Sequence, residues 1–495
     1  MSEPPPQGGI LLAAINAKWI HPSLSLRLLK ANLGPLENSC AIMEFALRQP
    51  LREKIEPILA ARPRILGLSV SIWNHTATLE LLRELRKEWE GRSGNPRPVV
   101  VLGGPEVSYL PPDAEIFNYA DYCIMGSEGE AAFRELCGQI LSETGENGAN
   151  RKVFSQKGQN FSPITFINRE FQQVDVSAIK SGYHLYTDED VRKKLLYVES
   201  SRGCPFGCEF CLSAHSPTVR EFPLEPFLAE MDDLLRRGAR TFKFLDRTFN
   251  LNIERARRIM DFFLSKMAER QEPFVVHFEM VPSRFPPELM ETLARFPAGT
   301  LRLEIGIQTL NPEVSARIGR PSNPAQELAA LRRLREETNA IIHADLIAGL
   351  PGEDIVSFAR GFDLLWAAIS PPLAVAPPDG DSGTEARPRT EIQLGILKLL
   401  PGAPIARHTA AFGMRYNPAP PYELLESAAL PARDLDRLKN FARFWELIVN
   451  RGLVHIDNSP VFDRFMSLSD SLFARFGRSW GIDKNTLQNS LKPLF

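Results

Sequence analysis

Short apolar runs alternate with longer amphipathic segments over the first 141 residues. The apolar runs predict strands at residues 10–15, 41–47, 65–72, 99–102 and 122–125. Apolar positions at helical spacing predict helices at residues 24–33, 51–61, 76–90 and 130–141. Strand–helix alternation with short connections favours an α/β fold, an open and mostly parallel sheet with helices on both faces. Such sheets bind ligands at the carboxyl ends of their strands.

Residues suited to a small ligand follow several of these strands. Ser69 and Ser71 lie at the end of the third run, and Gly103 and Gly104 end the fourth. Paired glycines let the backbone approach a flat ligand without a Cβ clash, and the serine hydroxyls offer hydrogen bonds to its polar part. The pattern predicts a small-cofactor site at this edge of the sheet.

The alternation resumes after a polar stretch. Residues 142–192 predict a linker with a small hairpin at 164–174. Further strands are predicted at residues 196–200, 241–245, 275–280, 300–307, 341–347 and 394–400, with helices at 224–237, 253–269, 287–296, 326–338 and 355–370. Six strand–helix units in series predict a partial parallel (β/α)6 barrel over residues 193–405, with its chemistry at the carboxyl ends of the strands.

The last part of the chain has a different character. Residues 370–389 are rich in proline and glycine, which predicts a loop on the barrel. Beyond residue 406 the pattern predicts a small, mostly helical region, whose strongest helix covers residues 432–449 with aromatic residues at core-like spacing. We therefore expect four segments, at residues 1–141, 142–192, 193–405 and 406–495.

Composition narrows the class of protein. The formal charge of −2 over 495 residues leaves no electrostatic footprint for nucleic acid. No apolar run reaches the length of about 18 residues that a membrane helix needs. The first nine residues lack the regions of a signal peptide, so we expect a cytoplasmic protein. Cys40, Cys123 and Cys137 lie in apolar surroundings and are expected to be buried thiols.

The other three cysteines are clustered. Cys204, Cys208 and Cys211 follow a predicted strand with the spacing Cys-x3-Cys-x2-Cys, and Phe210 precedes the last. Three thiolates on one loop can hold three irons of a [4Fe–4S] cluster and leave the fourth iron open to a ligand. The alternative from the same spacing is a zinc knuckle closed by a distant histidine such as His215, in a non-catalytic interaction protein.

The run at residues 201–211, with its aromatic residue, resembles the signature of the radical S-adenosylmethionine (SAM) superfamily. The resemblance implies that SAM binds the open iron and that the reduced cluster cleaves SAM to a 5′-deoxyadenosyl radical. It also implies a low-potential electron donor such as a flavodoxin or ferredoxin.

The strand ends downstream also resemble those of radical SAM barrels. By that resemblance Asp246 meets the amino group of SAM, Glu304 and Gln308 contact its ribose or the substrate, and Arg320 binds its carboxylate. Gly349 would let the backbone approach the adenine, and Phe210 would border the same site. These residues form the expected SAM site.

The domain ahead of the cysteines resembles that of the cobalamin-binding subfamily of radical SAM proteins. The resemblance implies a flavodoxin-like domain in which Ser69, Ser71, Gly103 and Gly104 line the nucleotide tail of cobalamin, with Glu128 in the acidic, glycine-containing ending at residues 126–130. The loop at residues 16–23 departs from the Asp-x-His-x-x-Gly motif that supplies a cobalt ligand. Its histidine, His21, is therefore either a cobalt ligand or a capping and packing residue.

The resemblance predicts a cobalamin-dependent radical SAM enzyme. Its radical would take hydrogen from an unactivated carbon, and methylcobalamin would deliver a methyl group to that carbon. A second interpretation is a radical SAM enzyme that catalyses a rearrangement or cyclisation without functional cobalamin. Near-neutral charge favours a small molecule or a peptide as the substrate.

Overall fold

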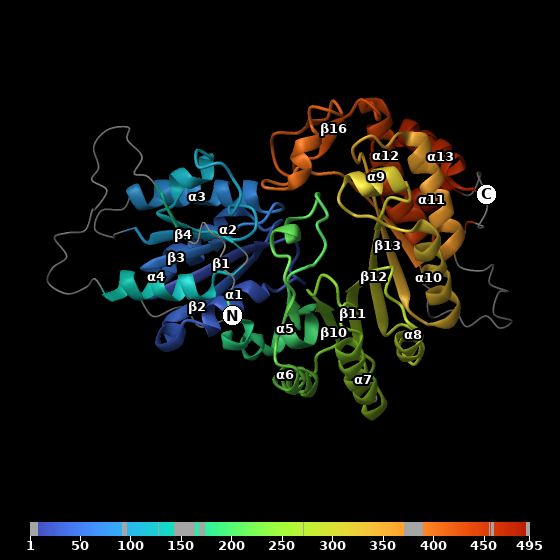
Figure 1. The fold of residues 1–495 in the computed structure, drawn as a ribbon. Helices are drawn as coiled ribbons and strands as arrows, with labels where there is room; N and C mark the ends of the chain where they lie inside the picture. Colours follow the sequence, from blue (N-terminus) through green and yellow to red (C-terminus); the bar gives the residue numbers. More distant parts are fainter. Residues whose placement is uncertain are drawn as a thin grey trace. The chain divides into compact units, whose positions relative to one another are not determined.

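The computed structural model describes residues 8–491 except 92–96, 127, 143–163, 168–173, 271, 371–389, 455 and 457–459. The chain divides into two compact units. The first comprises residues 1–198 and 221–242, and the second comprises residues 199–220 and 243–495. Each unit is described by itself below, with its elements labelled in Figure 1. No helix among the described residues combines the length and the apolar character needed to cross a membrane.

The first unit is built on a six-stranded sheet in the order β2-β1-β3-β4-β5-β6. Its neighbouring strands pair in parallel. The strands are β1 (Ile10–Asn16), β2 (Cys40–Ala46), β3 (Ile65–Ser69), β4 (Val99–Gly103), β5 (Tyr122–Ile124) and β6 (Thr165–Ile167). The chain reverses its direction of progress across the sheet between β1 and β3, which is where such sheets bind ligands. The order confirms the flavodoxin-like fold predicted from the sequence.

Two apolar cores cover the two faces of this sheet. Alternate residues of β1 point to opposite faces, so that Leu11, Ala13 and Ile15 enter one core and Ile10, Leu12 and Ala14 enter the other. Helices α2 (Leu51–Ala61) and α3 (His75–Glu90) pack on the first face, while α1 (Leu24–Ala31) and α4 (Glu130–Ser142) pack on the second (Figure 1). A strand that is apolar at every position therefore reflects burial on both sides.

Part of the linker forms the last strand of this sheet. Of residues 164–174, expected to form a hairpin, β6 pairs in parallel with β5 and extends the sheet. Residues 168–173, the rest of the expected hairpin, lie outside the described residues, as does most of the polar linker.

The second sheet runs in the order β14-β13-β12-β11-β10-β7. Its strands are β7 (Leu196–Val198), β10 (Thr241–Phe244), β11 (Val275–Met280), β12 (Leu301–Gln308), β13 (Ile341–Ala348) and β14 (Thr390–Ile396). The helices that alternate with them are α6 (Leu224–Arg236), α7 (Ile253–Glu269), α8 (Pro287–Ala294), α9 (Pro312–Arg317), α10 (Pro324–Glu337) and α11 (Ile355–Ile369). This sequential order confirms the predicted open barrel.

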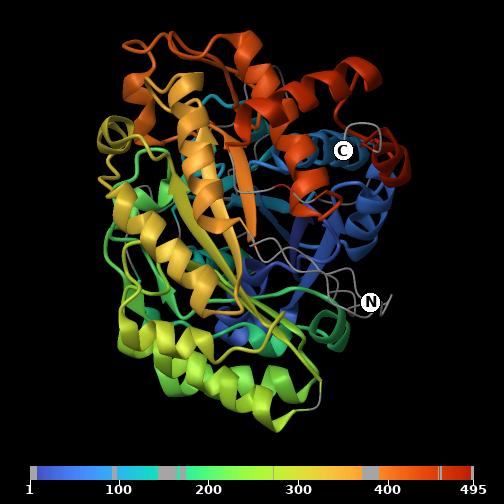
Figure 2. The same ribbon diagram turned by 90° about the vertical axis from the view of Figure 1, so that its right-hand side faces the viewer.

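The strands of the second unit have one apolar and one polar face. In β12, Leu301, Leu303, Ile305 and Ile307 are fully buried, whereas the residues between them are only half-buried. Helices α10 and α11 lie across one face of these strands (Figure 2). The apolar side chains pack under the helices, which leaves Arg302, Glu304, Gly306 and Gln308 on the inner face of the barrel.

The last strand begins earlier than predicted. The apolar run at residues 394–400 suggested a strand there, whereas β14 ends at Ile396. Beyond it, Leu399 donates a backbone hydrogen bond to Tyr422, and Leu424 donates one to Leu397. These bonds pair residues 397–399 with the C-terminal region, although the Leu397 N–H also donates to the carbonyl oxygen of Ala348 at the end of β13.

The C-terminal region is mostly helical, as predicted. It contains the 3-10 helix η7 (Pro404–His408), the short strands β15 (Arg415–Tyr416) and β16 (Leu424–Glu426), and the helices α12 (Ala432–Trp445), α13 (Phe462–Phe476) and α14 (Lys484–Leu491). The aromatic stripe of α12 is packing: Phe441 and Trp445 stack at 5.8 Å and meet Phe362 of α11 edge-on. The predicted loop at 370–389 lies outside the described residues, apart from Ser370.

Candidate functional site

The cysteine loop follows β7 and folds back on residues 216–218. Gly203 has a φ of 98°, and a Cβ on it would lie 2.1 Å from the carbonyl oxygen of Thr218, so only glycine fits there. The backbone N–H of Cys204 donates to the carbonyl of Ser216 at 2.9 Å, and that of Cys211 donates to Cys208 at 3.0 Å. The loop is thus a compact turn that carries all three thiols.

Two guanidinium groups of the second unit face these thiols. Burial raises the pKa of Cys204 and of Cys208. The guanidinium of Arg320, whose Nη1 lies 3.8 Å from the Cys208 sulfur, opposes this shift at Cys208, and Arg247 opposes it at Cys204. Positive charge beside the loop favours thiolates, the form in which cysteine ligates a metal.

The loop suits a cluster better than a single ion. Four ligands of one zinc ion lie about 3.8 Å apart, since Zn–S bonds are about 2.3 Å long. Among the described residues, no three His, Cys, Asp or Glu side chains come together as ligands of one ion. His215, the candidate fourth zinc ligand, instead places its Nε2 2.9 Å from the carbonyl oxygen of Gly402. An iron–sulfur cube binds each thiolate to a separate iron and so holds the thiolates further apart than the ligands of one zinc ion.

Asp246 supports the start of the cysteine loop. Its carboxylate is fully buried and accepts hydrogen bonds from the Ser200 N–H at 2.9 Å, the Ser200 hydroxyl at 2.7 Å and the Ser201 hydroxyl at 2.6 Å. Burial raises the pKa of Asp246, and these hydrogen bonds oppose the rise. A contact with the amino group of SAM stays a prediction, because both oxygens already have donors in this structure.

Glu304 lies on the inner face with a basic partner on either side. Lys243 Nζ is 2.8 Å away and His277 Nε2 is 3.2 Å away. Burial alone would raise the pKa of Glu304, but the contacts with His277 and Lys243, together with their charges, lower it to about 2. Glu304 is therefore an anion whose charge is already balanced within the barrel.

The inner face carries further polar residues that the sequence analysis did not select. Lys243, His277, Glu279, His343 and Asp345 alternate with buried apolar residues on β10, β11 and β13. Burial, followed by the charges of Glu304 and Glu279, raises the pKa of Asp345 well above its usual value. Its Oδ1 is buried without a hydrogen-bond partner. The sequence did carry a signal for these residues, because polar residues recur at every second position of otherwise apolar strands.

The end of β12 is strained. Gln308 adopts a φ of 70°, beside a bulge between Gly306 and Gln308 in the pairing with β13. Arg320 donates to the Gly306 carbonyl oxygen at this bulge. Left-handed backbone at a residue other than glycine is costly and is concentrated at functional sites. The three residues thus converge beside the cysteine loop.

Gly349, expected beside the adenine of SAM, packs against Leu424 in this structure. Its φ is 89°, and a Cβ on it would lie 2.4 Å from a methyl carbon of Leu424 in β16. The glycine is therefore required by packing against the C-terminal region, and its approach to adenine stays a prediction. Phe210, which precedes Cys211, is half-buried.

The expected cobalamin residues lie at the carboxyl edge of the first sheet. Ser69 ends β3, and the backbone N–H of the buried Ser71 donates to the Asn74 side chain at 2.8 Å. Asn74 in turn donates to the carbonyl oxygen of Ile15 at 2.9 Å, which ties the ends of β1 and β3 together. A Cβ on Gly104 would lie 2.4 Å from the Val70 carbonyl oxygen, so this glycine permits the close approach of two loops.

Glu128 is buried and accepts a hydrogen bond from the backbone N–H of Val174. It therefore anchors the end of the linker in this structure, and its contact with cobalamin stays a prediction.

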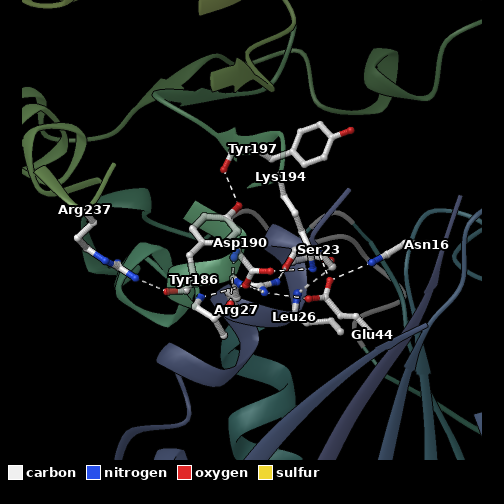
Figure 3. A network of polar contacts seen from close by, with 12 residues as sticks. Asn16, Ser23, Leu26, Arg27, Glu44, Tyr186, Asp190, Lys194, Tyr197 and Arg237 are labelled. Carbon is white, nitrogen blue, oxygen red and sulfur yellow. Dashed lines mark hydrogen bonds and ion pairs between the residues drawn. The ribbon is translucent and has the colours of Figure 1, made fainter. Parts of the chain in front are cut away.

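The loop after β1 is held by a buried network of charges (Figure 3). Glu44 of β2 accepts from Asn16 at 3.0 Å and from the backbone N–H of Ser23. Arg27 bridges Glu44 at 2.8 Å and Asp190 at 2.7 Å. The network fixes both ends of residues 16–23.

His21 lies in this loop and contacts the segment that leads into β7. Its Nδ1 is 3.0 Å from the hydroxyl of Tyr197, and the carbonyl oxygen of Ile20 accepts from the backbone N–H of Leu195. The imidazole is thus oriented by a second residue of the same unit. Its role as a cobalt ligand stays a prediction.

Two family models match the chain. The B12 binding domain matches residues 10–137, and the Radical SAM superfamily matches residues 198–365. The first covers the elements from β1 to most of α4, and the second starts at the end of β7 and ends within α11. The two domains imply cobalamin, a [4Fe–4S] cluster and SAM as cofactors.

Curated relatives match long stretches of the chain. The cobalamin-dependent radical SAM methyltransferase TokK of Streptomyces tokunonensis is 25% identical over 333 residues, which are 64% of this chain and 47% of the relative. The 2-(S-pantetheinyl)-carbapenam-3-carboxylate methyltransferase of Streptantibioticus cattleyicolor is 24% identical over 373 residues, which are 72% of this chain and 50% of the relative. The chain therefore spans about half the length of these curated relatives.

A solved structure shares the fold over nearly the whole chain. The cobalamin-dependent S-adenosylmethionine radical enzyme OxsB superposes with a TM-score of 0.63 at 16% identity, and the match covers 99% of this chain and 75% of OxsB. This likeness extends to the fold alone.

Proposed function

This chain belongs to the family of radical SAM proteins that carry a B12-binding domain, and on that premise we propose that it is a cobalamin-dependent methyltransferase. Its substrate is a small molecule or a peptide with an unactivated carbon. When bound, the cluster and SAM supply a radical that abstracts hydrogen, and cobalamin supplies the methyl group. Both curated relatives described above are named methyltransferases, which supports this choice of reaction.

The observation that carries the proposal is the position of Arg320 beside the cysteine loop. Its guanidinium lies 3.8 Å from the Cys208 sulfur and donates to the strained end of β12. The planar guanidinium of arginine can bind a carboxylate in a bidentate manner, through two parallel hydrogen bonds. Arg320 would hold the carboxylate of SAM, next to the loop whose cysteines would carry the cluster.

The inner face of the barrel would receive the substrate. Its charges are paired: Lys243 with Glu304 at 2.8 Å, Arg302 with Glu391 at 3.4 Å, and Arg247 with Glu279 at 3.4 Å. Burial raises the pKa of Asp345 well above the usual value, so this carboxyl holds its proton to a higher pH than an ordinary aspartate. The paired charges of this face favour a polar substrate without a large net charge.

Anaerobic reconstitution tests the proposal. We expect protein loaded with iron, sulfide and hydroxocobalamin to retain one corrinoid and one [4Fe–4S] cluster per chain. With a low-potential donor such as flavodoxin, ferredoxin or dithionite, it should convert SAM to 5′-deoxyadenosine, and the Cys208→Ala variant should not. Failure to retain corrinoid would contradict the cobalamin part of the proposal. Deoxyadenosine formation with a product that gains no methyl group would point instead to a rearrangement or cyclisation.

A further inference from the structure

Glu209, between two of the cluster cysteines, is joined to two distant segments of the second unit. Its backbone N–H donates to the carbonyl oxygen of Ile318 at 3.0 Å, and its own carbonyl oxygen accepts from the N–H of Ile405 at 3.0 Å. Glu209 is only 6% exposed. The middle of the cysteine loop is therefore fixed through backbone contacts on both sides.

The Glu209 side chain adds two polar contacts with the same distant segment. One carboxylate oxygen accepts from the Arg407 guanidinium, and the other lies 2.8 Å from Nε2 of His408. Arg407 is well exposed, whereas the His408 side chain is 13% exposed. His408 is therefore the buried partner, and Arg407 closes the pair from the solvent side.

The segments around these contacts pack closely on the loop. Gly319 has a φ of 68°, and a Cβ on it would lie 2.7 Å from the carbonyl oxygen of Gly207. On the other side, His215 contacts the carbonyl oxygen of Gly402. The loop is thus held between residues 318–320, which follow α9, and residues 402–408, which include η7.

A buried carboxylate is costly unless it is paired, and here it lies directly between Cys208 and Phe210. Its two oxygens and both backbone groups all point to elements outside the loop. We propose that Glu209 is a positioning residue that fixes the cysteine loop on η7 and on residues 318–320, and whose negative charge lowers the reduction potential of the cluster. This inference rests on the proposed function, because it requires the loop to carry the cluster.

Both parts of the role follow from physical chemistry. A loop anchored from outside keeps its three thiolates in place when one iron exchanges, so iron leaves slowly. Reduction adds negative charge to the cluster, and a fixed carboxylate nearby disfavours it. Glutamine at this position keeps the shape of the side chain and removes the charge, which separates the electrostatic contribution from packing.

The test compares Glu209→Gln with the wild type and with Glu288→Gln, a substitution of an exposed carboxylate on α8 of the same unit. In reconstituted full-length protein we expect Glu209→Gln to lose iron to a chelator roughly tenfold faster. Its reduction potential should move to a more positive value, and the electron paramagnetic resonance signal of its reduced cluster should change. Glu288→Gln should match the wild type in all three.

A role in stability alone would change the melting temperature of the apoprotein without moving the potential, and that result would overturn the electrostatic part of the inference. Unchanged iron loss and unchanged potential would overturn all of it. If Glu209→Gln does not fold, His408→Ala replaces it. We expect His408→Ala also to lose iron faster than the wild type, and iron loss at the wild-type rate would contradict the inference. A wild type that holds no cluster would contradict the proposed function instead, so the two failures are distinct.

Discussion

Arg320 is the residue at which several parts of the proposed SAM site meet. It contacts the Cys208 sulfur and the bulge of β12. Burial raises the pKa of Glu327 to about 7, and the charge of Arg320 opposes this rise. Replacing Arg320 with lysine keeps the charge but removes the fork that grips a carboxylate. We expect Arg320→Lys to weaken SAM binding about tenfold or more, as measured by calorimetry on cluster-loaded protein.

The control for that prediction is Arg332→Lys, because Arg332 is an exposed arginine on α10. It should leave the SAM affinity unchanged. Equal affinities for the wild type and Arg320→Lys, at equal iron content, would remove Arg320 from the SAM site.

Two carboxyls on neighbouring strands predict opposite pH dependences. The raised pKa of Asp345 stabilises the fold below the pKa of an unfolded aspartate, and this stability is lost as the pH rises towards the folded value. The lowered pKa of Glu304, about 2, stabilises the fold above about pH 4.3, and this stability is lost as the pH falls towards 2. Burial raises the pKa of both groups. At Asp345 the charges of Glu304 and Glu279 add to the rise, whereas at Glu304 the contacts with His277 and Lys243 overcome it.

Melting temperatures of the apoprotein between pH 3 and pH 8 check these signs. Relative to the wild type, Asp345→Asn should gain stability as the pH rises above 4. Glu304→Gln should melt at a lower temperature than the wild type at neutral pH, and this difference in melting temperature should shrink towards pH 3. Parallel curves for the wild type and Asp345→Asn would show that Asp345 ionises normally.

At the scale of residues, the sequence predicted which side chains take part in the chemistry better than it predicted what those side chains contact. The cysteine spacing identified the loop because its ligands are close in sequence. The pairing of Glu209 with His408 joins positions 199 residues apart, and no local pattern reports it. Asp246 and Gly349 were selected for SAM, yet the structure gives both of them structural partners, Ser200 and Leu424. A strand-end position predicts nearness to the site, whereas the direction of a side chain depends on tertiary packing.

At the scale of elements, the buried network around Arg27 holds the loop after β1. Removing the guanidinium would take the Arg27 counter-charge from Glu44, whereas Asp190 would keep Lys194 at 2.8 Å. We expect Arg27→Ala to destabilise the first unit by about 3–5 kcal/mol, as measured by denaturant unfolding. Its retention of hydroxocobalamin should fall as well, because residues 16–23 border the proposed cobalamin edge.

The matched variant for this prediction is Arg52→Ala. Arg52 pairs with Glu56 at 2.6 Å on the exposed face of α2. Such a surface pair is worth about 0.3–0.5 kcal/mol. Similar losses for the two variants would mean that burial of the Arg27 network contributes little.

Elements with a strong period were predicted closely. Helix α2 has the predicted bounds, Leu51–Ala61, because its apolar stripe is regular and Pro50 marks its start. Strand β14 was placed four residues too late, because the apolar residues Leu397 and Leu399 beyond its end hydrogen-bond with the C-terminal region. Strands β15 and β16 are two and three residues long, too short to produce a period.

At the scale of the molecule, the two units have separate cores and separate candidate cofactor sites. We therefore expect a variant with Cys204, Cys208 and Cys211 all changed to alanine to retain hydroxocobalamin at one equivalent while binding no iron. Absorption spectra after gel filtration and an iron assay measure both quantities. Loss of corrinoid together with iron would show that the first unit needs the cluster for its fold or its site.

The overall architecture was predictable because alternation of strands and helices repeats over long stretches. The division into units was not, since residues 221–242 belong to the first unit although they follow the cysteine loop in the chain. Such a discontinuity arises from packing between segments that are distant in sequence. Period and composition describe only the neighbours along the chain.

The six cysteines fall into two chemical classes, and this has a practical consequence. Burial raises the pKa of Cys40, Cys123 and Cys137 to about 12, which leaves these thiols inert towards alkylating reagents. Cys204 and Cys211 are partly accessible. In the folded apoprotein, iodoacetamide should label peptides from the loop alone, and bound iron should protect them. Peptide mass spectrometry would then report how much of a preparation is loaded, without any assay of activity.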